Sequence, residues 1–438
     1  MLDSKRSFFS ALLLILAYFA LPVDMVSGQV EVEIIADEGA KIPITIAPFD
    51  SESDLGLTVA EIITADLLKT GLFASRSVDA SWGVRSKLDS DEYATWSGRG
   101  TQNLVLGQFE RGQDGRIEVS FRLYDIPGQQ QTIGFKVKDD PRQLRQVAHY
   151  FADLIYEKLT GEPGVFRTKL TYVVRSKERS SLVIADSDGH NAREIFGTAE
   201  PILSPRWSPN GKHIAFVSFM NRKATVYVVS VDPKSGRALG QPEIIGPYRG
   251  SNSAPAWSKD GKSLALSVSQ NGRSDIYLVS MVDRAFRPLT NHQSINTEPT
   301  FSSDGESVIF TSDRTGRPNI YSIPVSGGKE LRLTYSGRYN ASAKSSHDGD
   351  FLVLIHNDGA GFNVATHDLK SGVTQILTNG ALDQSPSIAP NGRIIVYASE
   401  QSGRGILRFV SKNGRSKARY SGSFGELREP SWGPLIND

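Results

Sequence analysis

Apolar residues in the first third of the chain recur with two spacings, one typical of strands and one typical of helices. Residues 42–49 (IPITIAPF) form an apolar run closed by a proline-containing turn, which predicts a strand. Apolar positions over residues 54–70 recur every three or four residues and stop at Gly71, which predicts a helix with a left-handed glycine cap. The same spacing predicts a second helix over residues 144–159.

Three strands are predicted between these helices, over residues 103–109, 116–125 and 132–137. The predicted order is therefore β, α, β, β, β, α. This order is typical of a small α+β domain whose helices cover one face of the sheet.

One turn motif returns five times after about residue 165. The copies are WSPNG (207–211), WSKDG (257–261), FSSDG (301–305), SSHDG (345–349) and IAPNG (388–392). Successive turn glycines are 50, 44, 44 and 43 residues apart. A period near 44 with strand-like content predicts propeller blades of four strands each. Asn-Gly and Asp-Gly are strong hairpin signals because both turn positions favour a positive φ.

Each copy continues with the same pattern. A strand follows the turn, a third strand carries Tyr227, Tyr277 or Tyr321, and a short fourth strand ends in Leu-Thr at 289–290, 333–334 or 377–378. The aromatic side chains at Trp207, Trp257 and Phe301 are expected to fill the wedge between adjacent blades.

The two ends of the repeat region complement each other. Residues 170–175 and 182–186 resemble second and third strands with no first strand before them, and residues 429–432 (EPSW) resemble a first strand with nothing after it. Joining them adds a shared blade to the five copies and removes two exposed sheet edges. The predicted fold is mostly β: a six-bladed β-propeller, closed by a C-terminal strand, after a small α+β domain.

The direction of the strands assigns the loops to faces. Strands in a blade alternate in direction, so the segment before the first strand and the loop between the second and third strands share one face. The Asp-Gly turns lie on the other face. The first face has side chains that vary between blades, as expected of a specific binding surface.

The N-terminus has the pattern of an export signal. Lys5 and Arg6 precede an apolar run over residues 8–23, and small residues at 26–28 predict cleavage before Gln29. The run is too short for a membrane span. Residues 29–34 then alternate acidic or amide and apolar side chains, which predicts an extended segment. The expected organisation is a signal peptide (1–28), an extended partner-binding segment (29–40), an α+β domain (41–162) and a propeller (163–438).

The composition of the chain disfavours several classes of function. The 438 residues include 49 Lys and Arg against 48 Asp and Glu, a net charge of +1, which disfavours nucleic acid as a partner. The absence of Cys excludes disulfides, thiolate metal sites and cysteine nucleophiles. No Gly-x-Ser-x-Gly, His-Glu-x-x-His, Walker or Gly-x-Gly-x-x-Gly motif appears, which weakens the hypothesis that the protein is an enzyme.

The isolated polar residues do not indicate a catalytic or metal-binding site. Asp66 lies on the apolar side of the first helix, where a partly exposed structural role is expected. Asp186 and Asp188 resemble the start of a calcium loop, but Gly189 comes too early for that pattern and a blade hairpin is expected there. Five histidines lie on different strands and turns, so isolated structural roles are expected and neither a metal nor a cofactor is predicted: His213, His292, His347, His356 and His367.

Several longer segments resemble one family. They are VSFRLYD (119–125), AHYFADLIYEKLTGEPGVF (148–166), NTEPTF (296–301), FTSDRTGRPNIY (310–321), SPSIAPNG (385–392) and VSKNGRSKAR (410–419). Together with the export signal and the repeat, they are similar to the TolB family, the periplasmic component of the Tol-Pal system. The resemblance covers essentially the whole chain after residue 28.

The resemblance implies a periplasmic adaptor without catalysis that supports outer-membrane integrity and constriction during division. It implies a monomer in a heteromeric complex that binds the peptidoglycan-associated lipoprotein Pal, the inner-membrane-anchored protein TolA and further envelope proteins. The implied Pal residues lie on the first propeller face: Asn252, Ala254, Asn296, Thr297, Glu298, Asp313 and Arg314. The implied TolA segment is Gln29, Val30, Glu31, Val32, Glu33 and Ile34.

Two other functions remain open at this level. A propeller hydrolase or lyase would need histidines or carboxylates converging on the axis. A glycan-binding propeller would need exposed aromatic side chains on the loop face. The loops named above hold mostly Asn, Ser, Thr, Asp and Arg, which favours a polar protein interface.

Overall fold

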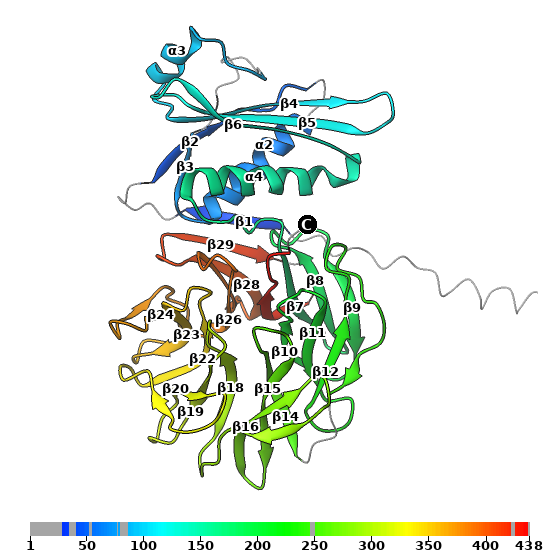
Figure 1. The fold of residues 1–438 in the computed structure, drawn as a ribbon, viewed down its shortest axis with the longest axis vertical. Helices are drawn as coiled ribbons and strands as arrows, with labels where there is room; N and C mark the ends of the chain where they lie inside the picture. The colour runs from blue at the N-terminus through cyan, green and yellow to red at the C-terminus, as the bar shows by residue number, and fades with distance from the viewer. Residues whose placement is uncertain are drawn as a thin grey trace, which may run out of the picture.

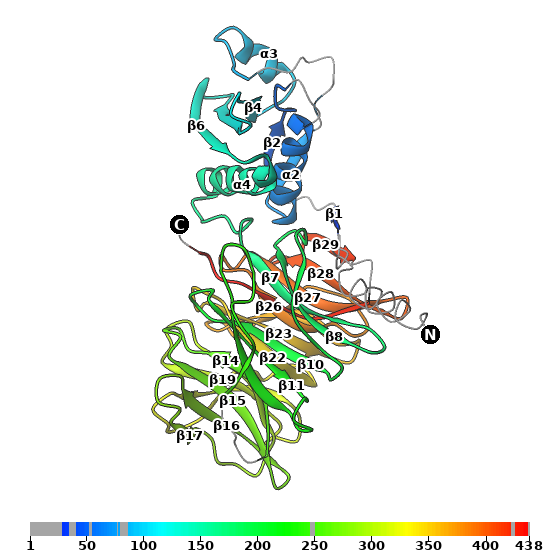
Figure 2. The ribbon, with the colours of Figure 1, turned by 90° about the vertical axis from the view of Figure 1, so that its right-hand side faces the viewer.

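The computed structural model describes residues 29–34, 41–51, 55–76, 78, 86–245, 250–421 and 425–436. It contains an α+β domain followed by a six-bladed β-propeller, as the sequence predicts (Figures 1 and 2). The predicted signal peptide lies outside the described residues. Within these ranges, no helix is both long and apolar enough to cross a membrane.

The α+β domain is built on one five-stranded sheet with the strand order β3-β2-β4-β5-β6. Its strands are β2 (Ile42–Ile46), β3 (Phe73–Arg76), β4 (Asn103–Arg111), β5 (Ile117–Asp125) and β6 (Gln130–Asp139). The short strand β3 was not predicted from the sequence. It pairs parallel to β2, as the right-handed β-α-β connection through the first helix requires.

Two helices cover one face of this sheet and a third lies on the other. Helices α2 (Leu55–Lys69) and α4 (Leu144–Thr160) share a core with β4 and β5. The two predicted helices therefore share one face, as expected. The short helix α3 (Glu92–Gly98), which was not predicted from the sequence, packs Trp96 against the opposite face. The turn η2 (Pro141–Gln143) leads into α4. The C-terminal caps of α2 and α4 are Gly71 and Gly161, both with positive φ.

The propeller has six antiparallel sheets. The C-terminal strand β30 (Glu426–Trp432) pairs with β7 (Lys169–Arg175), which confirms the closure of the ring through a shared first blade. The remaining strands of blade 1 are β8 (Ser180–Asp186) and β9 (Arg193–Thr198). We number the blades 1 to 6 from here in chain order.

The other five blades follow in sequence, each with its first strand innermost. Blade 2 is β10 (Ile202–Trp207), β11 (His213–Ser218), β12 (Thr225–Ser230) and β13 (Glu243–Ile244); blade 3 is β14 (Ser251–Trp257), β15 (Ser263–Gln270), β16 (Arg273–Ser280) and β17 (Phe286–Pro288). Blade 4 is β18 (Asn296–Phe301), β19 (Ser307–Ser312), β20 (Asn319–Pro324) and β21 (Leu331–Arg332); blade 5 is β22 (Tyr339–Ser345), β23 (Phe351–Asn357), β24 (Asn363–Asp368) and β25 (Thr374–Ile376). Blade 6 is β26 (Gln384–Ile388), β27 (Ile394–Gln401), β28 (Arg404–Ser411) and β29 (Ser416–Ser421).

The repeated residues have the roles that their spacing indicates, with one correction. Trp207 joins the side chains of blades 1 and 2 in one core cluster, which confirms the predicted wedge. In the Asn-Gly and Asp-Gly turns only the glycine has a positive φ. Asn210 keeps a negative φ, and its Oδ1 instead accepts hydrogen bonds from Ser208 Oγ at 2.7 Å and Lys212 N at 3.0 Å. The Asn210 side chain therefore caps the turn. Asparagine stabilises the turn here by accepting these hydrogen bonds, and not by tolerating a positive φ.

The N-terminal segment forms a fifth strand on blade 6. Strand β1 (Gln29–Ile34) pairs antiparallel with β29, from Gln29 opposite Ser421 to Ile34 opposite Ser416 (Figure 1). The segment is extended, as its alternating sequence predicts. Its backbone pairs with β29 along the whole segment.

The α+β domain rests on blades 1 and 6, on the side of the propeller that carries the Asn-Gly and Asp-Gly turns. Glu162 accepts a hydrogen bond from Arg393 Nε at 2.7 Å, beside the turn glycine of blade 6. A Cβ at Gly71 would stand 2.9 Å from Ser411 Oγ, in the turn between β28 and β29, so this close approach requires glycine. Both contacts lie on the same face of the propeller.

The centre of the domain interface is a buried charge cluster. Asp66 is 1% exposed, so the expectation of a partly exposed aspartate is wrong. Its Oδ2 lies 2.5 Å from His149 Nδ1, and His149 Nε2 lies 3.1 Å from Asp188 Oδ2 in the turn between β8 and β9. Lys69 and Arg145 complete the cluster beside Asp66 and Asp188 respectively. An imidazole from α4 thus joins carboxylates from both domains.

The electrostatics of the cluster favour a charged His149. Burial by itself lowers the pKa of His149, but the carboxylates of Asp66 and Asp188 outweigh it and raise this pKa to about 10. The same contacts explain Asp186 and Asp188 without calcium. Asp186 accepts a hydrogen bond from Lys169 Nζ at 2.9 Å, and Asp188 has His149 and Arg145 as partners.

Candidate partner-binding face

The face opposite the α+β domain is left uncovered by that domain. It carries the segments that enter each first strand and the loops between second and third strands. The domain's contacts with Ser187, Asn391 and Ser416 all lie at the other ends of the strands. We call the uncovered side the loop face.

Every first strand enters the propeller through the same backbone distortion. The pairing with the second strand shifts register in all six blades, which is the signature of a β-bulge. The residue at the bulge has a positive φ in each blade: Ser204, Ala254, Glu298, Ser342, Ser385 and Glu429. Positive φ is uncommon for residues other than glycine, so its sixfold repetition marks a built feature.

The bulges line a small polar cavity of about 80 Å³ on the propeller axis. Two acidic and two basic side chains face it. Glu429 and Glu298 come from blades 1 and 4, and Arg206 and Lys344 come from blades 2 and 5, so each like-charged pair stands three blades apart. Burial, together with the charge of Arg206, lowers the pKa of Lys344 to about 7, although the two glutamates act in the opposite direction.

Two predicted partner residues are buried in strands rather than exposed in loops. Asn252 lies within β14 and is 1% exposed. Asn296 is fully buried at the start of β18, where its Nδ2 donates to Asp275 Oδ1 at 3.2 Å. The first strands begin earlier than the sequence indicated, because the proline-containing bulge continues the strand instead of ending it.

Ala254, Thr297 and Glu298 lie at the bulges themselves. Thr297 is half-buried, and its Oγ1 accepts from Ser267 Oγ at 3.3 Å. Glu298 accepts from Ser342 N at 2.8 Å and from Thr311 Oγ1 at 3.0 Å, so it links blade 4 to blade 5. The Glu298 carboxylate is therefore engaged in the contact between blades 4 and 5.

Asp313 and Arg314 lie in the loop between β19 and β20, as predicted. Asp313 Oδ1 accepts from Ile295 N at 2.8 Å, which ties this loop to the segment entering β18. Arg314 donates to Asn296 Oδ1 at 3.0 Å and pairs with Glu330. The structure thus brings the predicted residues of blade 4 into one network that fixes the shape of the loop face.

Sequence analysis missed Arg206, Lys344 and Glu429, which share the axial cavity with Glu298. A signal was present, because five of the six bulge residues precede a proline, at 204, 254, 298, 385 and 429. A residue before proline is restricted in its backbone angles. A proline at the same place in five of the six blades therefore indicates that these first strands bend in the same way.

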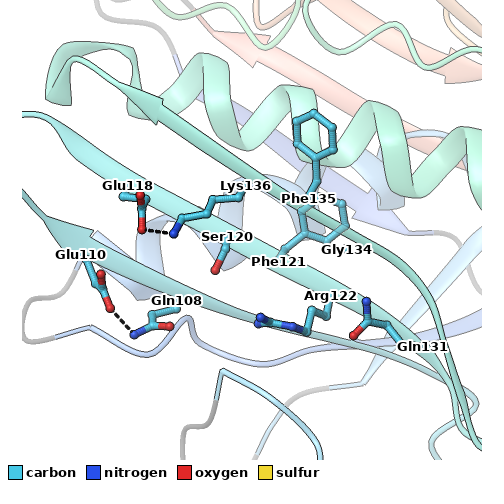
Figure 3. Close-up of a pocket in the computed structure, with 10 residues that line it drawn as sticks. All are labelled: Gln108, Glu110, Glu118, Ser120, Phe121, Arg122, Gln131, Gly134, Phe135 and Lys136. Atoms are coloured by element: carbon cyan, nitrogen blue, oxygen red, sulfur yellow. Dashed lines mark hydrogen bonds and ion pairs between the residues drawn. The ribbon is translucent and has the colours of Figure 1, made fainter.

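A second hollow lies on the outer sheet face of the α+β domain, with a volume of about 380 Å³ (Figure 3). Its charged side chains have partners within the protein, including Arg122, which donates to Ser86 O at 2.9 Å. Lys136 forms an ion pair with Glu118, and Gln108 Nε2 donates to Glu110 Oε1 at 2.5 Å. Nowhere in the described part of the chain do three His, Asp or Glu side chains gather as metal ligands.

The fold and the loop face define a class of protein, an α+β domain joined to a six-bladed propeller that leaves one polar face open. Comparison with known proteins then gives the family. A model described as the TolB beta propeller domain matches residues 156–436, and one described as the TolB amino-terminal domain matches residues 30–132. The chain belongs to the TolB family.

Individual relatives agree with this assignment. The chain is 50% identical over 435 residues to the Tol-Pal system protein TolB of Methylobacillus flagellatus, with 99% of this chain and 98% of the relative covered. It is 51% identical over 409 residues to the protein of the same name from Nitrosomonas europaea, with 93% and 94% covered. The crystal structure of TolB from Acinetobacter baumannii matches with a TM-score of 0.84 at 34% identity, covering 93% of this chain and 100% of that one.

Proposed function

We propose that this protein is a non-catalytic periplasmic adaptor of the Tol-Pal system. In this role it binds Pal through the loop face and TolA through the N-terminal segment, and so supports outer-membrane integrity and constriction during division. The observation that carries the proposal is the family membership, which extends over both domains.

The geometry of the loop face supports a protein partner. The α+β domain occupies the opposite face, so a partner can approach without displacing it. The network of Asn296, Asp313 and Arg314 holds the loop of blade 4 in one conformation before binding. A preformed polar surface loses little conformational entropy on association, which favours specific binding.

The pairing of β1 supports a role for the N-terminal segment in recognition by strand addition. Residues 29–34 already act as an added strand at the edge formed by β29. The same backbone groups can pair with the sheet edge of another protein. Binding of TolA through the groups that face β29 would require β1 to leave β29. The outer edge of β1, which is the last strand of its sheet in the described part of the chain, could instead add to a partner's sheet in place.

Substitution of Thr297 tests the location of the Pal site. We expect Thr297→Arg to weaken Pal binding at least tenfold, because a long charged side chain replaces a half-buried hydroxyl at the bulge of blade 4. Isothermal titration calorimetry with the soluble domain of Pal measures the effect. The matched control is Val373→Arg, which adds the same charge at a 61% exposed position on the opposite face.

The control variant is expected to bind Pal with unchanged affinity, and both variants should melt within a few degrees of the parent. Equal affinity of Thr297→Arg and the parent would place the Pal site elsewhere on the protein. An absence of any heat of binding for the parent itself would contradict the adaptor function.

A further inference from the structure

The loop face carries an unpaired cation from every blade. Arg179 and Arg314 on this face pair with Glu194 and Glu330. In each blade, one further exposed basic residue on this face forms no ion pair with a carboxylate in the part of the chain that the structure describes: Lys177, Arg222, Arg273, Arg317, Arg338 and Arg404, from blades 1 to 6 in that order. We call these six residues the cation ring.

The topology places the ring on one face. Five of its members lie in or directly beside the loop between the second and third strands of their blade. Blade 5 has no basic residue in that loop, and Arg338 takes the place instead. Its backbone N–H donates to Asn357 O at 2.7 Å, at the end of β23 where the loop starts. The six charges therefore encircle the mouth of the propeller.

Acidic residues lie in or beside the same loops, including the exposed Glu400 next to Arg404, but none forms an ion pair with a residue of the ring in the described part of the chain. Asp313 and Asp358 point a carboxylate oxygen at backbone N–H groups, those of Ile295 and Ala360 respectively. Glu178 is exposed in blade 1 beside Lys177. The six cations are local positive charges at the mouth of the propeller, in a chain whose net charge is only +1. Such a field attracts anionic groups over about one Debye length, roughly 8 Å at physiological salt.

Apolar side chains lie among these charges. Ile295 is 53% exposed, and its backbone bridges to Ser274, next to Arg273 of the ring. Leu382 is 44% exposed and bridges to Phe362 at the loop of blade 5. Apolar contacts within a charged rim are the usual anatomy of a protein interface. A purely electrostatic contact with a polyanion would not need them.

We propose that the cation ring recruits a protein partner through a carboxylate-rich surface on that partner. This inference rests on the proposed function, since it assigns to Pal the acidic surface that the ring selects. The ring accelerates encounter over a long range, and the apolar and hydrogen-bonding groups within it then hold the bound partner. Charges at the rim of an interface act mainly on the rate of association.

The test compares two triple variants by stopped-flow association with the soluble domain of Pal at several salt concentrations. The ring variant carries Arg222→Glu, Arg273→Glu and Arg317→Glu. The matched control carries Lys259→Glu, Lys262→Glu and Lys370→Glu, which make the same charge change at exposed turns on the opposite face. Circular dichroism melting verifies that both variants fold.

At low salt the ring variant is expected to associate about tenfold or more slowly than the parent, with a much weaker dependence on salt. The control should stay within about twofold of the parent. An unchanged rate and salt dependence in the ring variant, with normal binding by the parent, would overturn the role of the ring and leave the Pal site intact. Failure of the parent to bind Pal would contradict the proposed function itself.

A membrane surface is distinguished in the same experiment series. Phosphatidylglycerol vesicles replace Pal in a co-sedimentation assay at 0.15 M salt. We expect no co-sedimentation of the parent protein. Vesicle binding by the parent that the ring variant loses would overturn the assignment to an acidic protein and indicate a lipid headgroup instead.

Discussion

Truncation of the chain after Leu427 is expected to lower the melting temperature by more than about 10 °C. The deletion removes most of β30, including its pairs with Thr171 and Leu170 in β7. It also removes Trp432, which is 6% exposed, packs edge-on against Phe409 and donates its indole N–H to Thr168 Oγ1 at 2.8 Å. Loss of one buried tryptophan costs about 3–5 kcal/mol, and the opened ring exposes two sheet edges in addition.

Differential scanning calorimetry measures this effect. A chain that ends at Trp432 is the matched control, because it keeps β30 and loses only the residues beyond it. We expect the control to melt within a few degrees of the full chain. The same melting temperature for both truncations would show that β30 does not close the ring.

Removal of the His149 side chain is expected to destabilise the protein by about 3–5 kcal/mol at pH 7. The imidazole is fully buried between Asp66 and Asp188, and its loss leaves buried carboxylates without their shared cation. Breaking a buried ion pair from one side has a cost of this size. Chemical denaturation of His149→Ala at pH 7 measures the loss.

The pH dependence separates this charge effect from a loss of packing. The folded pKa of His149 is about 10, above the unfolded value near 6.5. Its contribution is thus fully present below pH 6.5 and is lost as pH rises through 10. The stability difference between parent and His149→Ala should therefore shrink between pH 7 and pH 10. A difference that stays constant would contradict a charged His149.

His356→Ala is the matched control for that experiment. His356 is also buried, and burial lowers its pKa, so it is neutral at both pH values. Its side chain forms a hydrogen bond of 2.8 Å with Asn340 Oδ1. We expect His356→Ala to lose stability by the same amount at pH 7 and at pH 10.

The features that the sequence predicts correctly are those with local causes. The turn glycines at 211, 261, 305, 349 and 392 each have a positive φ, and the period of these turns counts five of the six blades. The closing strand was predictable because residues 429–432 carry the same local pattern as the first strands of other blades. Helices α2 and α4 followed from apolar spacing alone.

The features that were missed depend on distant partners. Asp66 can be buried because His149, far along the chain, supplies a compensating charge, which it shares with Asp188 of the propeller. Strand β1 pairs with β29, from the other end of the sequence. No local pattern contains either contact. Arg314 is a further example. Its position in a loop suggests a side chain free to bind a partner, but Asn296 and Glu330 already bind it.

The central claim is that the loop face, and not the face with the Asp-Gly turns, receives Pal. Hydrogen–deuterium exchange of the protein with and without the soluble domain of Pal tests it most directly. The account predicts slower exchange on binding in residues 250–257 and 291–318, with unchanged exchange in the turns around Gly261 and Gly305. Protection confined to those turns or to the α+β domain would contradict it.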